Sequence, residues 1–381
     1  MVAANLYEVE RPPVYADIFR RAYEATGEQR FLDWFLAVAD LAVAIKQPEG
    51  GYARNARVKH LGATETHEGR MTFRNARGMK LVTVILQAYD FTGDERYLHS
   101  AIETADWALQ TQHEDGAWQS DYPAPERGYL KLHMLNDGVT TSPTRTLMMV
   151  HERTGDERYL AAIARTGDWF IANQLAEPTP GWAQEYHSEG RAAWGRRFEP
   201  AAACSAPTAT VTNLLMDIHL LTGEERYLGP VAAALAWLER SQLPGGGWAR
   251  FYECKTNRPL YFTSDDRTTY RLTYDDADAP DHYGFKGNWG AYSHRARWER
   301  LQAIGREALI AEEAAESSLA ELREKVPAME QSVRELIARE GRLGRYSTEG
   351  GHVTRLASDV AWVGLYVKRY NDLQRLEAAG Q

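Results

Sequence analysis

Positively charged and aromatic residues are interleaved in the segment GGGWARFYECKTNRPLY at residues 245–261. The residues in it that could contact a ligand are Trp248, Arg250, Tyr252, Lys255 and Arg258. Aromatic rings can stack on sugar rings, and an arginine can hold a carboxylate through two parallel hydrogen bonds. The segment therefore indicates a site for an acidic sugar, although the whole chain of 381 residues has a formal net charge of −9.

Composition and cysteine content restrict the class of protein. With 44% hydrophobic and 25% charged residues, the chain has the composition of a soluble globular protein. It contains no apolar run near the roughly 18 residues that span a bilayer, and residues 1–19 lack an apolar signal core. Cys204 and Cys254 are the only cysteines, so neither a disulfide framework nor a zinc cluster is expected. The net negative charge argues against nucleic acid as a partner.

Two short motifs recur in phase along the chain. The first, which we call the turn motif, has copies TGEQRFL, TGDERYL, TGDERYL and TGEERYL starting at residues 26, 92, 154 and 222. The second ends in an aromatic residue, with copies EGGY, DGAW, TPGW and GGGW ending at residues 52, 118, 182 and 248. Four copies of two motifs that keep step over roughly 65 residues indicate a repeat fold.

Each repeat unit has the pattern of two helices joined by a turn. Apolar residues recur at helical spacing over 81–91 and again over 99–112. The glycine of the turn motif lies where a helix needs a left-handed stop, and Asp94, Asp156 or Glu224 can cap the helix that follows. The sequence therefore predicts a helical hairpin in every unit.

Stacked hairpins that bury each other's faces can close into an α/α toroid or barrel. We therefore predict an all-α fold and a single domain over residues 1–381, because no proline- or serine-rich linker divides the chain. Residues 254–296, rich in aspartate, tyrosine, threonine and proline, are expected to form a long irregular excursion that carries function. Residues 297–381 are expected to form the C-terminal helices.

The loop after the second helix of each unit contains the second motif, and we call these four segments the glycine-aromatic loops. All four should emerge at the same end of the toroid. Trp182 and Trp248 have two interpretations: they either seal helix ends as hydrophobic plugs or line a shared cleft. A polar side chain two residues after each ring, such as Gln184 or Arg250, could point into that cleft.

Three blocks of the chain resemble the family 10 polysaccharide lyases, a pectate lyase-like family. Residues 181–208, with GWAQEYH and WGRRFEPAAACSAPT, are similar to the family's Gly-Trp-Ala-Gln-Gln-Tyr and Trp-Ala-Arg-Ser-Phe-Glu-Pro-Pro-Ala. Residues 245–261 are similar to its Trp-Ala-Arg-Phe-Tyr-Glu and Thr-Asn-Arg-Pro, and residues 91–138 resemble the repeat that leads to its Asn-Asp-Asp. Weaker similarity extends over nearly the whole chain.

The resemblance implies β-elimination on a uronate-containing polysaccharide, in which the C5 proton beside the carboxylate is removed and the 4-linked sugar is expelled. Because that proton is only weakly acidic, cations must neutralise the carboxylate. The family's base is an arginine, and the segment SDDRT places Arg267 in that role, with Arg258 as the alternative. Arginine has a pKa above about 12, so an arginine base needs a dry site among other cations. Arg196 matches an arginine that binds the substrate carboxylate, unless it only forms a salt bridge with Glu199 or a neighbouring residue.

The chain departs from the family at two acidic positions. Arg74, next to Asn75, stands where the family has an active-site aspartate, and Asp137 in NDG lacks the second carboxylate of Asn-Asp-Asp. Calcium prefers several oxygen ligands, so a calcium site at Asp137 should be weaker than in the family. Arg74 and Asn75 are therefore expected to bind the substrate carboxylate, unless Arg74 only pairs with an acid such as Asp137.

Our leading hypothesis is a polysaccharide lyase that acts on a uronate-containing acidic polysaccharide. Two alternatives remain from the residues: a glycoside hydrolase that uses Asp137, and a non-catalytic protein that binds acidic glycans. The expected partner is an acidic polysaccharide or oligosaccharide, with no nucleic acid, no membrane and a monomeric state. The resemblance implies a secreted or periplasmic protein, while the residues themselves leave a cytoplasmic location open.

Overall fold

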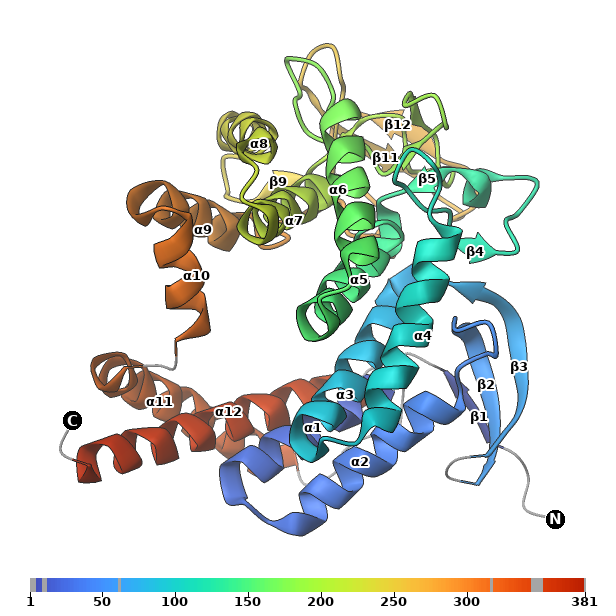
Figure 1. Ribbon diagram of the computed structural model, residues 1–381. Helices are drawn as coiled ribbons and strands as arrows, with labels where there is room; N and C mark the ends of the chain where they lie inside the picture. Colours follow the sequence, from blue (N-terminus) through green and yellow to red (C-terminus); the bar gives the residue numbers. More distant parts are fainter. Residues whose placement is uncertain (1–4, 9–11, 61–62, 316–317, 344–351, 380–381) are drawn as a thin grey trace.

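The helices of the computed structural model form successive hairpins (Figure 1). The structure describes residues 5–8, 12–60, 63–315, 318–343 and 352–379. The four repeat units supply the pairs α1 (Pro12–Thr26) and α2 (Gln29–Ala44), α3 (Arg77–Thr92) and α4 (Glu95–Thr111), α5 (Thr141–Thr154) and α6 (Glu157–Ala172), and α7 (Ser205–Thr222) and α8 (Leu228–Arg240). They are followed by α9 (Ala291–Ile304), α10 (Arg306–Ala314), α11 (Leu319–Leu343) and α12 (His352–Ala378).

The first helix of each hairpin contributes to an inner row. Helix α3 packs against α1 and α5, and α7 packs against α5 and α9. The second helix of each hairpin lies outside this row, and α12 packs against both α1 and α11. One large apolar core runs through the hairpins, and a small second cluster joins α11 to α12. The predicted all-α toroid is therefore confirmed.

The turn motifs close one end of the hairpins by local interactions. Their glycines, Gly27, Gly93, Gly155 and Gly223, have φ values between 64° and 76°. Asp94 accepts a hydrogen bond from the Arg96 backbone N–H at 3.0 Å, and Asp156 accepts one from the Arg158 N–H at 2.9 Å.

The capping prediction is wrong for Glu224. Its side chain makes no capping hydrogen bond and instead pairs with Arg226 at 2.5 Å. The next helix begins with a 3₁₀ turn, Glu225–Tyr227. Glutamate is one methylene longer than the aspartate that fits the cap position in the other units.

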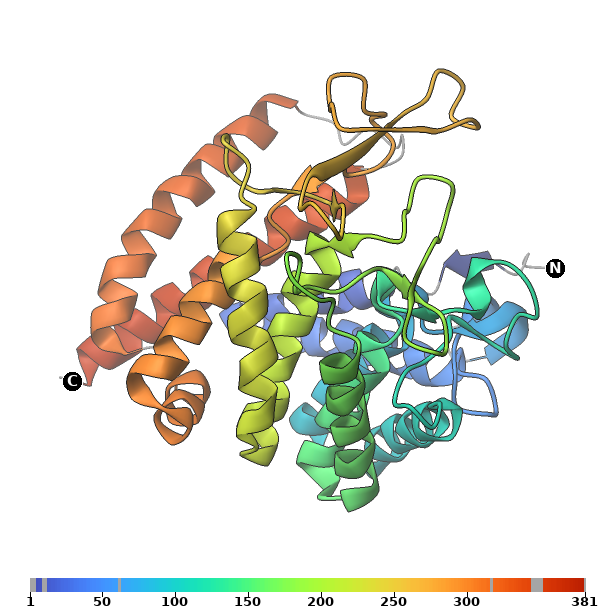
Figure 2. The ribbon, with the colours of Figure 1, turned by 90° about the horizontal axis from the view of Figure 1, so that it is seen from above.

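The glycine-aromatic loops lie at the opposite end and are joined to one another. Each link is a backbone hydrogen bond of 2.8 to 3.0 Å across a unit boundary: Phe73 N–H to Ser120 O, Leu135 N–H to Gln184 O, and Ser205 N–H to Arg250 O. In Figure 2 the long loops of residues 255–290 lie at the upper edge, and the turn between the green helices α5 and α6 lies at the lower edge. The expected common end of the four loops is thus confirmed.

Short strands reinforce this end, which the all-α prediction did not include. One sheet contains β1 (Asn5–Glu8), β2 (Ala53–His60), β3 (Ala63–Thr72) and β4 (Asp121–Tyr122) in that order. A second contains β5 (His133–Met134), β6 (Glu185–Tyr186) and β7 (Ala192–Ala193). A third sheet contains β8 (Ala203–Cys204), β10 (Phe251–Tyr252), β11 (Pro259–Thr263) and β12 (Arg271–Thr273) in that order. A fourth contains β9 (Trp248–Ala249) and β13 (Lys286–Gly287).

The expected excursion contains β11, β12, β13 and long loops, and it ends earlier than predicted because α9 begins at Ala291. Within the described residues, every helix is too short or too polar to cross a membrane.

Candidate functional site

The inner helices begin at the end that carries the glycine-aromatic loops. In the described structure, the residues at the N-cap positions of α3, α5, α7 and α9 make no side-chain capping hydrogen bond, in contrast to those of α4 and α6. The first N–H groups of a helix carry partial positive charge, so this end of the toroid favours anions.

Half-buried Arg196 and fully buried Glu199 form an ion pair in the segment before α7. Glu199 Oε1 also accepts hydrogen bonds from Asn136 Nδ2 at 3.0 Å and from the Tyr283 hydroxyl at 2.8 Å. Burial by itself would raise the pKa of Glu199, but the hydrogen bond and the charge of Arg196 outweigh it and lower the pKa. The Arg196 guanidinium lies 5.1 Å from the centre of the Tyr283 ring.

Arg250 lies beside this pair and has a different kind of environment. Its guanidinium is 4.6 Å from the centre of the Tyr283 ring and 5.2 Å from that of Trp289. Its Nε donates to the Gly284 carbonyl at 2.6 Å, and its Nη1 donates to Gln184 Oε1 at 3.3 Å. These acceptors are uncharged, and Arg196 lies over the same Tyr283 ring.

Arg74 and Asp137 face each other from the short 3₁₀ helices η1 (Arg74–Ala76) and η3 (Asn136–Gly138), which pack together. Arg74 Nε is 3.5 Å from Asp137 Oδ2, so the two residues form the ion pair that was the alternative to substrate binding by Arg74. Asn75, Ala76 and Asp137 have φ values of 58°, 55° and 52°. Non-glycine residues rarely adopt this conformation, and it concentrates at binding sites where the surroundings enforce it.

Tyr129, in η2 (Tyr129–Lys131), lies among these charged groups. Burial raises the pKa of its hydroxyl, and the charges of Arg74 and Arg196 oppose that effect. The Arg74 pair and the Arg196 pair are joined into one site by Asn136, which precedes Asp137 and donates a hydrogen bond to Glu199.

Glu185 is a part of the site that the sequence analysis missed. Its side chain is fully buried, and neither carboxylate oxygen has a hydrogen-bond partner among the residues that the structure describes. Burial and then the charge of Glu199 raise the pKa of Glu185 well above its usual range. A side chain at Gly195 would meet it, because an added Cβ would lie 2.7 Å from the Glu185 carboxyl carbon. A signal existed in the sequence, since GWAQEYH has glutamate where the similar family motif has glutamine.

The structure contradicts the prediction that Trp182, Trp248 and Tyr252 contact substrate, because their exposed fractions are 0%, 3% and 1%. Their polar atoms satisfy the ends of the preceding helices: Trp182 Nε1 donates to Phe170 O, Trp248 Nε1 to Leu238 O, and the Tyr252 hydroxyl to Ser241 O. Trp118 repeats this arrangement with Ala108 O. These rings are hydrophobic plugs, because each must seal the gap between two helices.

The remaining predicted cations lie outside this site. Arg267 is in an exposed loop and contacts Asp281 at 2.7 Å, with its side chain 65% exposed. A base made from arginine needs a dry site among cations, so this position does not support Arg267 as the base. Arg258 is exposed and stacks at 3.6 Å on the Tyr274 ring, and Lys255 is exposed. Neither faces the Arg196 pair in the contacts described.

The described residues do not fit the expected calcium site. Asp137 pairs with Arg74, whose positive charge opposes a bound cation. No group of three or more histidine, cysteine, aspartate or glutamate side chains in the described part of the chain is arranged to hold a metal ion.

Comparisons with known proteins agree with this architecture. The family model of pectic acid lyase matches residues 46–139. A search of curated proteins gives no match.

Among solved structures, a mutant of the family 10 polysaccharide lyase from Cellvibrio cellulosa in complex with trigalacturonic acid is 16% identical. The match covers 77% of this chain and 98% of that chain, with a TM-score of 0.55. Another structure of the Cellvibrio enzyme matches over 75% of this chain and 95% of its own, also at 16% identity and a TM-score of 0.55. Cellobiose 2-epimerase from Bacillus thermoamylovorans is 12% identical over 78% of this chain and 72% of its own, with a TM-score of 0.51.

At these identities the shared property is the fold. The chain thus resembles the family 10 polysaccharide lyases in its α/α toroid and, over residues 46–139, in its sequence.

Proposed function

We propose that the protein is a polysaccharide lyase that cleaves a uronate-containing acidic polysaccharide by β-elimination. One observation carries the proposal: Arg74, Arg196 and Arg250 come from three different repeat units and gather at the uncapped ends of the inner helices. A site with three fixed guanidinium groups is suited to a ligand with carboxylates along its length.

The proposed chemistry begins with neutralisation of a substrate carboxylate. Arg196 and Arg74 can hold this carboxylate, so that negative charge can flow into it when the C5 proton leaves. Their partners Glu199 and Asp137 hold the guanidinium groups in place.

Arg250 is our candidate for the base. It is half-buried between the Tyr283 and Trp289 rings, its hydrogen-bond acceptors are uncharged, and a second guanidinium lies nearby. Arg250 therefore lies inside the site beside Arg196, whereas Arg267 lies in an exposed loop. Tyr129 is our candidate for the acid. Burial raises the pKa of its hydroxyl, so the hydroxyl keeps its proton and can donate it to the departing sugar oxygen.

The departure from the family at Arg74 leads us to propose that calcium is not essential. A guanidinium that holds a carboxylate neutralises it much as a calcium ion would, although with less concentrated charge. The Arg74–Asp137 pair supports this assignment, because it uses the one acid expected to bind the metal.

A spectroscopic assay tests the function directly. Elimination leaves a C4–C5 double bond conjugated to the carboxylate, which absorbs in the ultraviolet. We expect this absorbance to rise when the protein is incubated with polymers that contain 4-linked uronates. New reducing ends without the absorbance would identify a glycoside hydrolase, and binding without any product would identify a non-catalytic glycan-binding protein. A secreted or periplasmic location and a monomeric state belong to the same proposal.

A further inference from the structure

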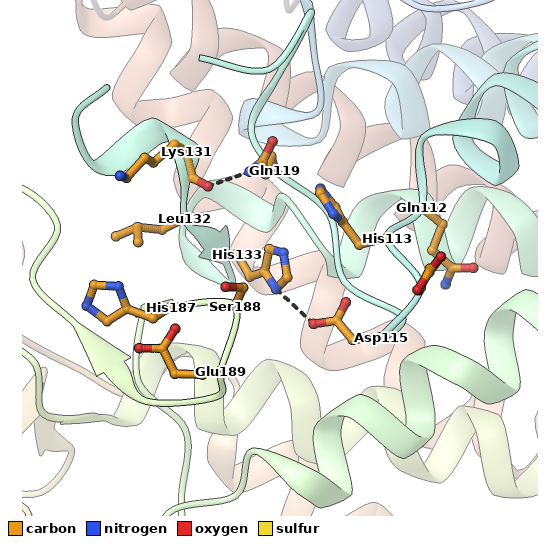
Figure 3. A pocket seen from close by; sticks show the side chains of 11 residues that line it. Gln112, His113, Asp115, Gln119, Lys131, Leu132, His133, His187, Ser188 and Glu189 are labelled. Carbon is orange, nitrogen blue, oxygen red and sulfur yellow. Dashed lines mark hydrogen bonds and ion pairs between the residues drawn. The ribbon is translucent and has the colours of Figure 1, made fainter. Parts of the chain in front are cut away.

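We call Arg74, Arg196 and Arg250 with their partners the arginine site. A cavity apart from these residues is lined by two of the glycine-aromatic loops (Figure 3). Its volume is about 880 Å³. The loop after α4 forms one wall, the turn after β6 forms the opposite wall, and β5 with the segment before it lies between them. We call this cavity the lateral pocket.

The lateral pocket is polar but has no excess of positive charge. Its fixed charges are those of Lys131, Glu114, Asp115 and Glu189, which give +1 and −3, hence −2 with histidines neutral. His113 stays uncharged at neutral pH, because burial and the neighbouring His133 lower its pKa. The arginine site has the opposite character, with three guanidinium groups against the paired carboxylates of Asp137 and Glu199.

The polar groups of the pocket are held in place by neighbouring residues. His133 is 4% exposed, and its Nδ1 lies 3.0 Å from Asp115 Oδ2. The His133 ring is also 4.7 Å from the centre of the His113 ring. Gln119 donates its Nε2 to the Lys131 carbonyl at 2.5 Å, while its Oε1 is buried without a partner in the described residues. Such a set of fixed donors and acceptors is suited to hydroxyl groups.

The lateral pocket and the arginine site are neighbours along the same strands. Within β5 and β6, His133 pairs with Tyr186 and Met134 pairs with Glu185. His133 lines the pocket, whereas the Glu185 carboxyl group lies against Gly195, the residue before Arg196. The η2 turn makes a second connection, since the charges of Arg74 and Arg196 act on the pKa of Tyr129 while Lys131 lines the pocket. The pocket and the arginine site are therefore built on the same elements.

Resting on the proposed function, we infer that the lateral pocket is a subsite for an uncharged sugar unit. A uronate carboxylate would meet three acidic side chains there and a single lysine, whereas the hydroxyl groups of a neutral sugar would meet matched donors and acceptors. The substrate is then a mixed polymer in which neutral sugars stand next to uronates, rather than a homopolymer of uronate.

Two oligosaccharides of equal length test this inference. In one, 4-linked uronates alternate with neutral hexoses, and the other contains only uronates. We expect kcat/KM to be higher for the alternating oligosaccharide. The double variant Glu114→Lys with Glu189→Lys should lower the ratio of kcat/KM for the alternating oligosaccharide to kcat/KM for the uronate oligosaccharide by roughly threefold to tenfold. The reason is that two charges that repel a uronate carboxylate are replaced by two that attract it. Both side chains are exposed, so the fold should tolerate them.

The matched control is Glu152→Lys with Glu157→Lys, which changes the net charge equally at the turn-motif end of α5 and α6. This control should keep the ratio of the unmodified protein. An unchanged ratio in the pocket variant, or the same shift in both variants, would overturn the inference while the lyase activity remained.

A binding measurement separates the inference from the proposed function. A neutral hexose oligosaccharide should shift the NMR signals of the His133 and His187 imidazoles, assigned with a His187→Gln variant, and should do so equally in an Arg196→Ala variant. Absence of the shift would refute the subsite. A shift without ultraviolet-absorbing product from any polymer would support the subsite and reject the lyase.

Discussion

The two ends of the helical hairpins are closed in different ways. At the turn-motif end, Asp94 and Asp156 cap their own helices, and an added Cβ on Gly93 would meet no atom within 4 Å. At the glycine-aromatic end, an added Cβ on Gly116 would lie 2.3 Å from the Arg165 carbonyl oxygen. The helix caps at the first end lie within one unit, although turn-motif residues such as Tyr97 also contact the preceding unit through Asp40. The loops at the second end are joined by backbone hydrogen bonds between units.

This difference explains why function concentrates at one end. At the turn-motif end, Asp94 and Asp156 satisfy the termini of α4 and α6, so these termini leave little positive charge for a ligand. The glycine-aromatic end leaves the inner helices uncapped and brings arginines from several units together. Contacts between units thus create a positively charged site on an acidic protein.

The largest effect should come from Arg250→Lys at the glycine-aromatic end. Lysine keeps the charge but loses the planar group that lies between the two rings, so kcat should fall by about 100- to 1000-fold. The ultraviolet assay measures this loss, and Arg267→Lys in the exposed loop serves as the control. Equal losses in both variants would return Arg267 to the candidates for the base.

The next largest effect concerns stability. Gly116→Ala forces a Cβ against a backbone oxygen of the next unit, so we expect the free energy of unfolding to fall by about 3 kcal/mol or more. Gly93→Ala keeps only the strain of a left-handed residue, so the loss should be about 1–2 kcal/mol. Urea unfolding compares the two, and a greater loss for Gly93→Ala would contradict the contrast between the ends.

Glu185→Gln should make the protein more stable at neutral pH. Because the pKa of Glu185 is raised in the folded state, the native protein keeps a proton that the unfolded chain loses, and stability falls as pH rises above the usual glutamate pKa of about 4.3. Glutamine avoids this loss, so the gain should be about 1–3 kcal/mol at pH 7 and vanish near pH 4. Urea unfolding at several pH values measures it, with exposed Glu152→Gln as the control. A variant less stable than the unmodified protein at pH 7 would show that the buried carboxylate is charged and partnered.

A smaller effect is expected from the caps at the turn-motif end. Asp156→Ala removes a hydrogen bond to the first turn of α6 and should cost about 1 kcal/mol. Glu224→Ala should cost less, because that side chain makes no capping bond. Thermal unfolding measures both, with activity unchanged in each variant. A larger loss for Glu224→Ala would mean that its pair with Arg226 contributes more than a cap.

The smallest effect should come from removing metal ions. If guanidinium groups neutralise the substrate, a chelator should change the rate of the ultraviolet assay by less than about twofold. Activity that a chelator abolished and calcium alone restored would contradict the proposed role of Arg74.

Much of the architecture could be predicted because it depends on local interactions. The glycine of each turn motif stops a helix through its own φ, and Asp94 and Asp156 cap the next helix within two residues. In-phase repeats then place all glycine-aromatic loops at one end, as the structure confirms. Glu224 shows the limit of this reasoning, because one methylene removes the cap without altering the motif.

The site itself depended on tertiary structure. Trp182 and Trp248 have the residue type of sugar-binding rings, and only the packing of adjacent helices shows that they are buried plugs. Arg267 lies in a segment similar to the family motif, yet its loop places it in solvent beside Asp281.

Helix hairpins, turn motifs and the repeat were thus determined by the sequence alone, since each rests on residues a few positions apart. The assembly of Arg74, Arg196 and Arg250 joins residues more than 50 positions apart in the chain, and no local pattern contains that proximity. The same holds for Glu185. Its raised pKa depends on its burial, with Gly195 close to its carboxyl group, and on the charge of Glu199. Tertiary packing decided the chemistry, because the dielectric environment and the partners of a charged group come from whatever packs around it.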